Sequence, residues 1–183
     1  MTRNDALVIL DEHVKNPNLK KHMLAVESVM RSYAEKYNGD PDEWGIAGLL
    51  HDFDWEIHPT AAEHPVKGQP ILESRGVPAP IRHAILAHAA HVGVKPETDM
   101  EKALFASDEL TGLIVAVALV SPNKKLSDVT IDRVIKKMAQ KAFAANVNRD
   151  EIIDGARLLN IPLELHIGNV LVSMQQNHEQ LGL

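Results

Sequence analysis

Apolar residues recur at three- and four-residue steps along most of the chain, which is the spacing of one face of an α-helix. The clearest case is a helix from about residue 19 to residue 37, whose apolar positions are Met23, Val26, Val29, Met30 and Tyr33. Asn38-Gly39 is a typical C-terminal stop, and Asp40-Pro41 is a typical N-cap followed by proline in the first turn. These signals predict that the next helix begins at residue 41 and ends near residue 51.

The same periodicity predicts further helices. Asn4 or Asp5 is expected to cap a helix that ends near Lys15, before the break at residues 16–18. Pro70 is awkward in the helix predicted over 65–74 and would shorten or kink it. The remaining helices are expected at 78–91, 99–120, 128–143, 150–159 and 162–180, with a loop at 53–63. The segment 129–131 has strand propensity but stands alone, so the pattern predicts an all-α helical bundle.

Composition fits one globular domain. The 183 residues suit a single domain with a proper core, and no linker, low-complexity tract or internal repeat divides them. Aromatic residues make up only 4% of the chain, so aliphatic side chains must fill the interior. The formal charge of -6 argues against broad nucleic-acid binding, which needs a basic face, but leaves room for a small anion pocket. The absence of cysteine excludes disulfides, thiolate chemistry and cysteine-type zinc sites.

No segment predicts a membrane span. The most apolar run, residues 110–120, is well short of the ~20 residues that a spanning helix needs, and a buried helix is the better interpretation. The first 15 residues carry early acids and do not resemble a signal peptide, so a cytoplasmic location is expected. The apolar run and the C-terminal helix could support a homodimer or could be ordinary core, and the sequence leaves both open.

The pair His51-Asp52 stands out because it follows the small and apolar run 45–50. Neighbouring residues on a helix point about 100° apart, but at a helix end the chain can turn and let an imidazole and a carboxylate reach one divalent ion. Asp52 has two oxygens and could also bridge two ions. For the pair alone, the alternative is that Asp52 caps the following loop and that His51 is a partly buried, hydrogen-bonded histidine.

Two other polar residues lie in apolar surroundings far from this pair. His22 is one turn into its helix and close to the apolar stripe, where a single histidine is more often a hydrogen-bonded boundary residue than a ligand. Asp108 lies in the most apolar helix of the chain, and buried carboxylates are rare unless they are paired or bind a metal. Asp108 therefore has the strongest individual claim to a metal, with Glu109 as its solvent-facing neighbour.

The remaining histidines supply more candidates. His64 precedes the segment PVKGQPIL, and His88 and His91 are three residues apart, which would place them on one face of a helix. Surface positions without a role in the site are expected for the others, namely His13, His58, His83, His166 and His178.

These residues, in this order, resemble the HD superfamily of metal-dependent phosphohydrolases. The family pattern is a distant His, then His-Asp, then a distant Asp, all on helices. The phrases KHMLAVE, GLLHDFDWE and SDELTGLIVA are similar to a branch of small HD-domain proteins, which extends through KKMAQKAFAANVNRD. The resemblance implies a single HD domain over residues 1–183, with its core over 19–120 and a C-terminal helical extension over 121–183.

The resemblance also implies the ligands. One ion would be held by His22, His51, Asp52 and Asp108. Family members with a second metal carry further histidines between the pair and the last Asp. Here His64 and His88 match those positions, with Asp52 as the bridge and His91 nearby. Imidazole and carboxylate donors suit manganese, iron, magnesium or zinc without deciding between them, or whether one or two ions bind.

The chain departs from the family pattern in three places. Many members carry a lysine shortly after His-Asp, and here Phe53, Asp54, Trp55 and Glu56 stand there instead. Lys67 or Arg82, or the pair at 20–21, would have to bind the substrate phosphate. The second histidine pair and the Gly-Tyr-Pro signature of cyclic-dinucleotide phosphodiesterases are missing, which argues against that activity. Pro70 replaces a small residue.

The resulting hypothesis is a phosphomonoesterase or phosphodiesterase that acts on a small, phosphorylated, nucleotide-like substrate through a metal-activated water. Asp52 would be central to catalysis, and Asp54 is either an outer-shell base or a solvated loop acid. Two alternatives stay open. Some HD relatives are di-iron oxygenases, and a non-catalytic HD domain would only bind a ligand or a partner.

Overall fold

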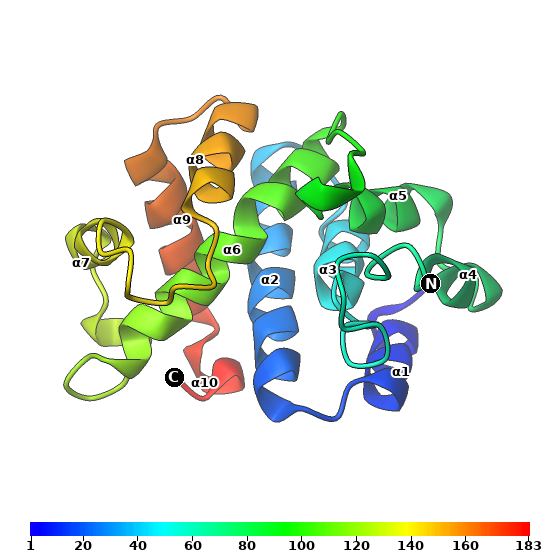
Figure 1. Ribbon diagram of the computed structural model, residues 1–183, viewed down its shortest axis with the longest axis horizontal. Helices are drawn as coiled ribbons and strands as arrows, with labels where there is room; N and C mark the ends of the chain where they lie inside the picture. Colours follow the sequence, from blue (N-terminus) through cyan, green and yellow to red (C-terminus); the bar gives the residue numbers. More distant parts are fainter. The chain divides into compact units, whose positions relative to one another are not determined.

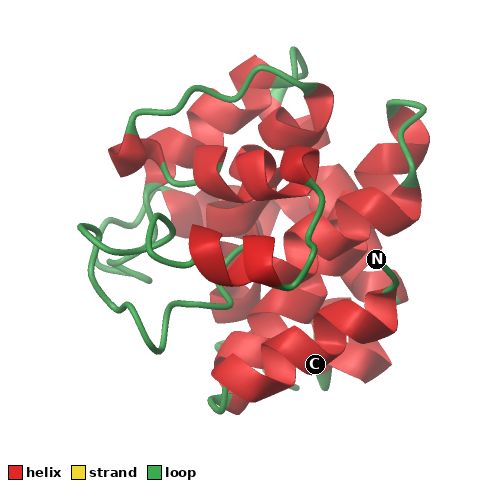
Figure 2. Cartoon of the chain, turned by 90° about the vertical axis from the view of Figure 1, so that its right-hand side faces the viewer, coloured by secondary structure: helices red, strands yellow, loops and turns green.

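The structure is a computed structural model that describes residues 1–183 (Figure 1). It contains helices, turns and loops but no strand (Figure 2), so the all-α prediction is confirmed. The chain divides into two compact units, residues 1–105 and 106–183, and the boundary falls inside helix α6, Asp99–Leu119. The single domain with its core at 19–120 stays a prediction.

Unit 1 is built from five α-helices and one short 3-10 turn before α6 begins. They are α1 Arg3–His13, α2 Pro17–Lys36, α3 Pro41–Leu50, α4 Gln69–Ser74, α5 Ala79–Ala87 and the 3-10 turn Ala90–Val92. The predicted stripe of α2 is buried in full: Met23, Val26, Val29, Met30 and Tyr33. The periodicity argument therefore holds for the longest helix of this unit.

Capping residues explain where the first helices begin. Thr2 caps α1 and exchanges hydrogen bonds with Asp5, so the predicted cap at Asn4 or Asp5 is wrong by a few residues. Asn16 caps α2, and Asp40 caps α3 as predicted, each with a proline in the first turn, where the missing N–H costs nothing.

Helices α2 and α3 pack closely against each other (Figure 1). Gly48 makes this approach possible, since a Cβ atom there would lie 3.0 Å from the backbone of Glu27. Only four residues connect the two helices, so they run in opposite directions and the end of α3 lies beside the start of α2. The small residues of the run 45–50 thus bring the polar residue after α3 close to the first turns of α2.

The segment between α3 and α6 differs most from the sequence prediction. Helix α4 begins only at Gln69, so Pro70 lies in its first turn and neither kinks nor interrupts a helix. Helix α5 ends at Ala87, with His88 as its C-cap, whereas the prediction continued it to residue 91. His88 and His91 therefore do not share a helix face, and that prediction is wrong.

Unit 2 contains the rest of α6 and four further α-helices. They are α7 Ile131–Met138, α8 Arg149–Leu158, α9 Leu163–Gln176 and α10 His178–Leu181, with a 3-10 turn at Leu126–Asp128. The predicted helix over 128–143 is shorter, because Thr130 caps α7 and the chain turns after Met138. Residues 129–131 form no strand.

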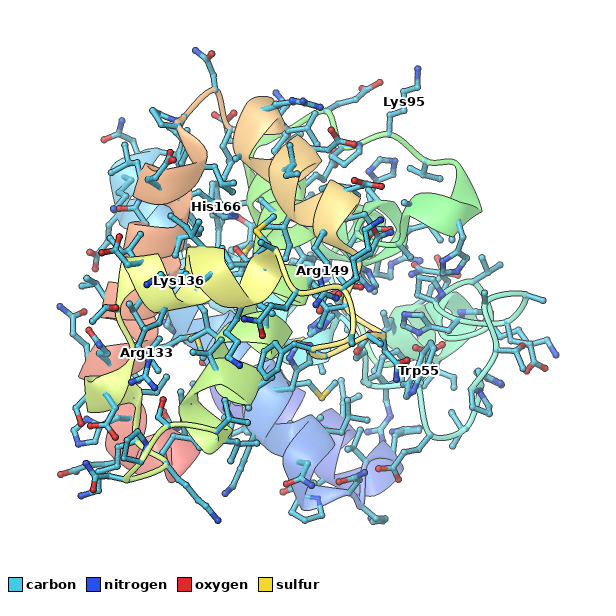
Figure 3. All side chains as sticks on the ribbon, turned by 60° about the vertical axis from the view of Figure 1, so that its left-hand side comes forward. Trp55, Lys95, Arg133, Lys136, Arg149 and His166 are labelled. Atoms are coloured by element: carbon cyan, nitrogen blue, oxygen red, sulfur yellow. The ribbon has the colours of Figure 1, made fainter.

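The loop between α7 and α8 has its own support. The guanidinium of Arg149 donates hydrogen bonds to the carbonyl groups of Phe143, Ala144 and Val147 (Figure 3). These bonds satisfy backbone carbonyl groups that form no hydrogen bond within a helix.

No helix in either unit combines the length and the apolar character that crossing a bilayer requires.

Candidate metal centre

Three side chains of unit 1 meet where the start of α2 lies beside the end of α3. His22, in α2, and His51, directly after α3, have their Nε2 atoms 3.2 Å apart. Asp52 follows at once, and its Oδ2 lies 3.5 Å from Nε2 of His51. One ligand atom from each of the three lies within 4.8 Å of the others. We call these three residues group 1.

Asp52 also belongs to a second set, with His64 and His88, which we call group 2. Nε2 of His64 lies 3.2 Å from Oδ1 of Asp52 and 3.4 Å from Nε2 of His88. Nε2 of His88 lies 3.5 Å from the same Oδ1. His64 comes from the long loop between α3 and α4, and His88 from the end of α5 (Figure 1), so group 2 joins three segments of unit 1.

The two oxygens of Asp52 point to different groups. Oδ2 lies nearest to His51 of group 1, whereas Oδ1 lies nearest to His64 and His88 of group 2. The Asp52 side chain is 17% exposed, while its histidine neighbours in group 2 are almost fully buried. A carboxylate in this position can hold one ion by either oxygen or two ions by both.

The spacing of these atoms suits a bound cation. Two nitrogens about 2.1 Å from one ion are about 3.0 Å apart at a right angle and about 3.4 Å apart at the tetrahedral angle. The separations of 3.2 Å in group 1 and 3.4 Å in group 2 fall in this range. The donor set of imidazole nitrogen and carboxylate oxygen fits manganese, iron or zinc. Magnesium prefers oxygen ligands, so it would bind mainly through the carboxylate and water.

Two of the histidines are oriented by a backbone carbonyl at their other ring nitrogen. Nδ1 of His51 lies 2.8 Å from the carbonyl oxygen of Gly48, and Nδ1 of His88 lies 2.5 Å from that of Ile85. A carbonyl oxygen only accepts hydrogen bonds, so the Nδ1 atom of each ring carries the proton. The Nε2 atom of each ring is therefore unprotonated and keeps its lone pair. His51 in group 1 and His88 in group 2 each therefore present an unprotonated nitrogen, the atom that binds a metal ion, to the inside of their group.

The local charges support the same interpretation. Burial acts against the charged form of Asp52, but the electrostatic effect of His51 and the hydrogen bonds of His64 and His88 hold the pKa of Asp52 well below its ordinary value. Burial also lowers the pKa of His64, yet its hydrogen bonds to Asp52 and Asp54 outweigh it and raise that pKa to about 9. A metal ion in group 2 would take the place of this proton.

The loop that carries His64 is fixed from several sides. The Glu56 carboxylate accepts hydrogen bonds from the backbone N–H groups of Lys15 and Asn16, which ties the loop to the α1–α2 connection. Phe53 is fully buried, and the ring of Trp55 (labelled in Figure 3) stands edge-on to His64 with 5.0 Å between centroids. The loop therefore presents His64 as a positioned side chain.

Asp54 is buried with 0% exposure, so its interpretation as a solvated loop acid is wrong. Its Oδ1 lies 2.7 Å from Nδ1 of His64. His91 lies outside both groups, and its Nε2 donates to the backbone carbonyl of His64 at 2.9 Å. The metal role predicted for His91 stays a prediction.

The two cations predicted to bind phosphate both form ion pairs. Nζ of Lys67 lies 2.6 Å from Glu63, and Nη2 of Arg82 lies 3.0 Å from Glu73. Each pair includes a well-exposed side chain, so water screens it and a competing anion could open it at little cost. Their roles in phosphate binding stay predictions.

Asp108, the fourth predicted ligand, belongs to unit 2. It lies in α6 and its side chain is partly buried. Its role in holding the first ion stays a prediction that rests on its place in the sequence pattern.

Two histidines have environments that sequence reasoning missed. His83 is exposed as predicted, but it pairs at 2.8 Å with the buried Glu101, which also accepts from the backbone N–H groups of Glu97 and Thr98 at the start of α6. His166, in unit 2, is fully buried and donates to the carbonyl of Ala106 (Figure 3). A buried position in the apolar stripe of α9 was the available signal for His166.

Comparison with known protein families gives one match. The profile described as HD domain matches residues 19–164, which is most of the chain and includes parts of both units. No curated protein and no solved structure matches the chain at a significant level.

Proposed function

Because the chain belongs to the HD domain family, we propose that it is a metal-dependent phosphohydrolase that uses two ions bridged by Asp52. The observation that supports this most directly is the division of the Asp52 carboxylate, with one oxygen toward His51 and the other toward His64 and His88. Asp108 would complete the ligands of the first ion, as the family pattern implies.

When bound, divalent ions polarise a phosphoryl oxygen and make a water molecule more acidic. The chain's own residues set the conditions for this chemistry. His22 and His51 would hold one ion, His64 and His88 the other, and Asp52 would fix the spacing between them. Backbone carbonyls keep the imidazoles of His51 and His88 in the tautomer whose Nε2 carries the lone pair that binds a metal.

The proposed substrate is a small phosphate ester, such as a nucleotide. A chain with a formal charge of -6 does not favour a long polyanion, and the ions themselves would supply the attraction for one phosphate group. Lys67 and Arg82 could add to that attraction once their acidic partners release them.

Elemental analysis of protein purified without chelators tests this proposal. Wild type should hold two ions per chain, and His51→Ala and His88→Ala should each lose about one. His178→Ala is a matched control, because His178 is exposed and its side chain donates only to the backbone carbonyl of Gln175, three residues earlier. The same proteins should be assayed on a panel of phosphomonoesters and phosphodiesters, where both site variants should lose at least a hundredfold in rate.

The alternatives make different predictions for the same samples. If the bound metal is iron and product forms only in the presence of oxygen, the protein is an oxygenase and not a hydrolase. Protein that binds no metal and turns over no ester would be a ligand-binding HD domain. Metal content that stays unchanged in His51→Ala would remove group 1 from the proposal.

A further inference from the structure

The Asp54 carboxylate is the most unusual acid in unit 1. It is fully buried, and its Oδ1 lies 2.7 Å from Nδ1 of His64. Its second oxygen, Oδ2, is also buried and has no hydrogen-bond partner. A buried carboxylate with an unsatisfied oxygen is costly, so a compensating positive charge is expected on the far side of the ring that it touches.

His64 differs in this respect from the other two oriented histidines of the centre. Nδ1 of His51 and Nδ1 of His88 each donate to a neutral backbone carbonyl three residues earlier in the chain. Nδ1 of His64 instead donates to a full negative charge. A carboxylate partner makes the opposite ring nitrogen a stronger base and a better metal ligand than a carbonyl partner does.

The surroundings of Asp54 leave it no room to move. A Cβ atom on Gly68 would lie 2.6 Å from Oδ2 and 2.7 Å from Cγ of Asp54, and 2.9 Å from the buried ring of Phe53. Gly68 has ordinary helical dihedral angles, so its backbone does not require glycine. The requirement is space, because a Cβ atom there would displace the carboxylate that contacts His64.

We propose that Asp54 is a positioning residue that holds Nε2 of His64 toward Asp52 and His88 and strengthens it as a ligand of the second ion, and that Gly68 provides the space for it. The inference rests on the proposed function, because it presumes that group 2 binds an ion. It gives Asp54 a role different from the base predicted from the sequence, since a fully buried carboxylate does not reach a substrate.

Calorimetric titration of the metal-free full-length protein with Mn²⁺ tests this role. Asp54→Asn keeps the shape and one acceptor but removes the charge, and it should weaken binding of the second ion roughly 10- to 100-fold. Gly68→Ala should act in the same direction without changing any charged residue. Both variants should bind the first ion within about threefold of wild type, because group 1 does not contact Asp54.

Two further variants and a change of metal make the outcome decisive. His64→Ala should lose the second ion completely and sets the limit of the effect. Gly112→Ala is the matched glycine control, since a Cβ atom there meets nothing within 4 Å. Substitution of cobalt for manganese adds a spectroscopic readout, in which Asp54→Asn should shift the visible absorption of the second ion only.

Wild-type affinity for the second ion in both Asp54→Asn and Gly68→Ala would overturn the inference while leaving the two-ion function in place. Equal weakening of both ions would also overturn it, because Asp54 would then be a general packing residue. If wild type binds a single ion and His64→Ala binds it with unchanged affinity, group 2 is not a metal site and the inference fails. A hydrolase with one ion would then still be tested separately by His51→Ala.

Discussion

The partner of each buried imidazole decides its chemical character. In His64, two carboxylates outweigh the effect of burial and raise the pKa to about 9. In His166, burial dominates the single hydrogen bond to the carbonyl of Ala106 and lowers the pKa to about 4. The same residue type therefore holds a proton at one site and is neutral at the other, and only His64 has the carboxylate neighbours that would favour a metal ion in place of that proton.

This difference predicts how stability depends on pH in unit 2. His166 is neutral when folded, with a pKa of about 4, whereas its ordinary value of 6.5 applies in the unfolded chain. Its contribution to stability is therefore fully present above pH 6.5 and is lost as the pH falls toward 4. The loss amounts to about 1.4 kcal/mol per pH unit and about 3 kcal/mol over the whole interval.

Urea unfolding of wild type and His166→Gln between pH 4.5 and pH 7.5 measures this contribution. The glutamine amide can still donate to the Ala106 carbonyl but does not titrate. The difference in unfolding free energy between the two proteins should shrink as the pH falls, since every other titrating group is common to both. Parallel curves would contradict the assignment.

At the scale of helices, close approach depends on single glycines. A Cβ atom on Gly155 of α8 would lie 2.5 Å from the backbone Cα of Ala106 in α6, and backbone atoms cannot move aside as a flexible side chain can. Gly112 of α6 is the opposite case, with nothing within 4 Å of a Cβ atom. Both glycines lie in helices of unit 2, so helix propensity is similar and space is what differs.

Alanine at the two positions should therefore have opposite effects. Gly112→Ala should raise the free energy of unfolding by up to about 1 kcal/mol, because alanine is the better helix former. Gly155→Ala gains the same propensity but overpacks the contact between α8 and α6, and a net loss of about 1–3 kcal/mol is expected. Thermal and urea unfolding of both variants check this, and an unchanged or raised stability of Gly155→Ala would show that the helices can separate without cost.

The helices whose limits could be predicted are those with local signals. The start of α3 is signalled by two adjacent residues, the N-cap Asp40 and Pro41 in the first turn. The start of α6 was also predicted correctly, at Asp99. The predicted shortening at Pro70 is confirmed, since α4 begins only at Gln69, but α5 was extended too far. No stop signal in the sequence marks its end at Ala87, because Gly93 lies several residues beyond it.

The same distinction applies to the metal centre. His22, His51, His64 and His88 could be selected because their order and spacing follow a family pattern, and the structure brings them together around Asp52. The role of Asp54 could not be predicted, because its burial and its contact with Gly68, far along the chain, depend on the fold. A carboxylate in a loop, viewed in sequence, looks like any solvated acid.

At the scale of the whole molecule, the two groups share one residue. Asp52 is the common member, so the two ions are not independent of each other if both bind. Removal of either histidine set should leave one ion in place, whereas removal of the Asp52 carboxylate should affect both. This nonadditivity distinguishes a bridged pair from two separate sites.

Binding of divalent metal should consequently stabilise the folded protein in a way that depends on Asp52. A ligand that binds only the folded state adds about 2.7 kcal/mol at a free concentration 100 times its Kd. Thermal unfolding of metal-free wild type should therefore move to higher temperature as Mn²⁺ is added, and His51→Ala and His88→Ala should each retain part of that shift. Asp52→Asn should lose nearly all of it, as should the double variant His51→Ala/His88→Ala.

Each protein is compared with its own metal-free form, because loss of the Asp52 charge also changes stability without metal. A shift in Asp52→Asn as large as in either single histidine variant would mean that each group binds its ion without the shared carboxylate.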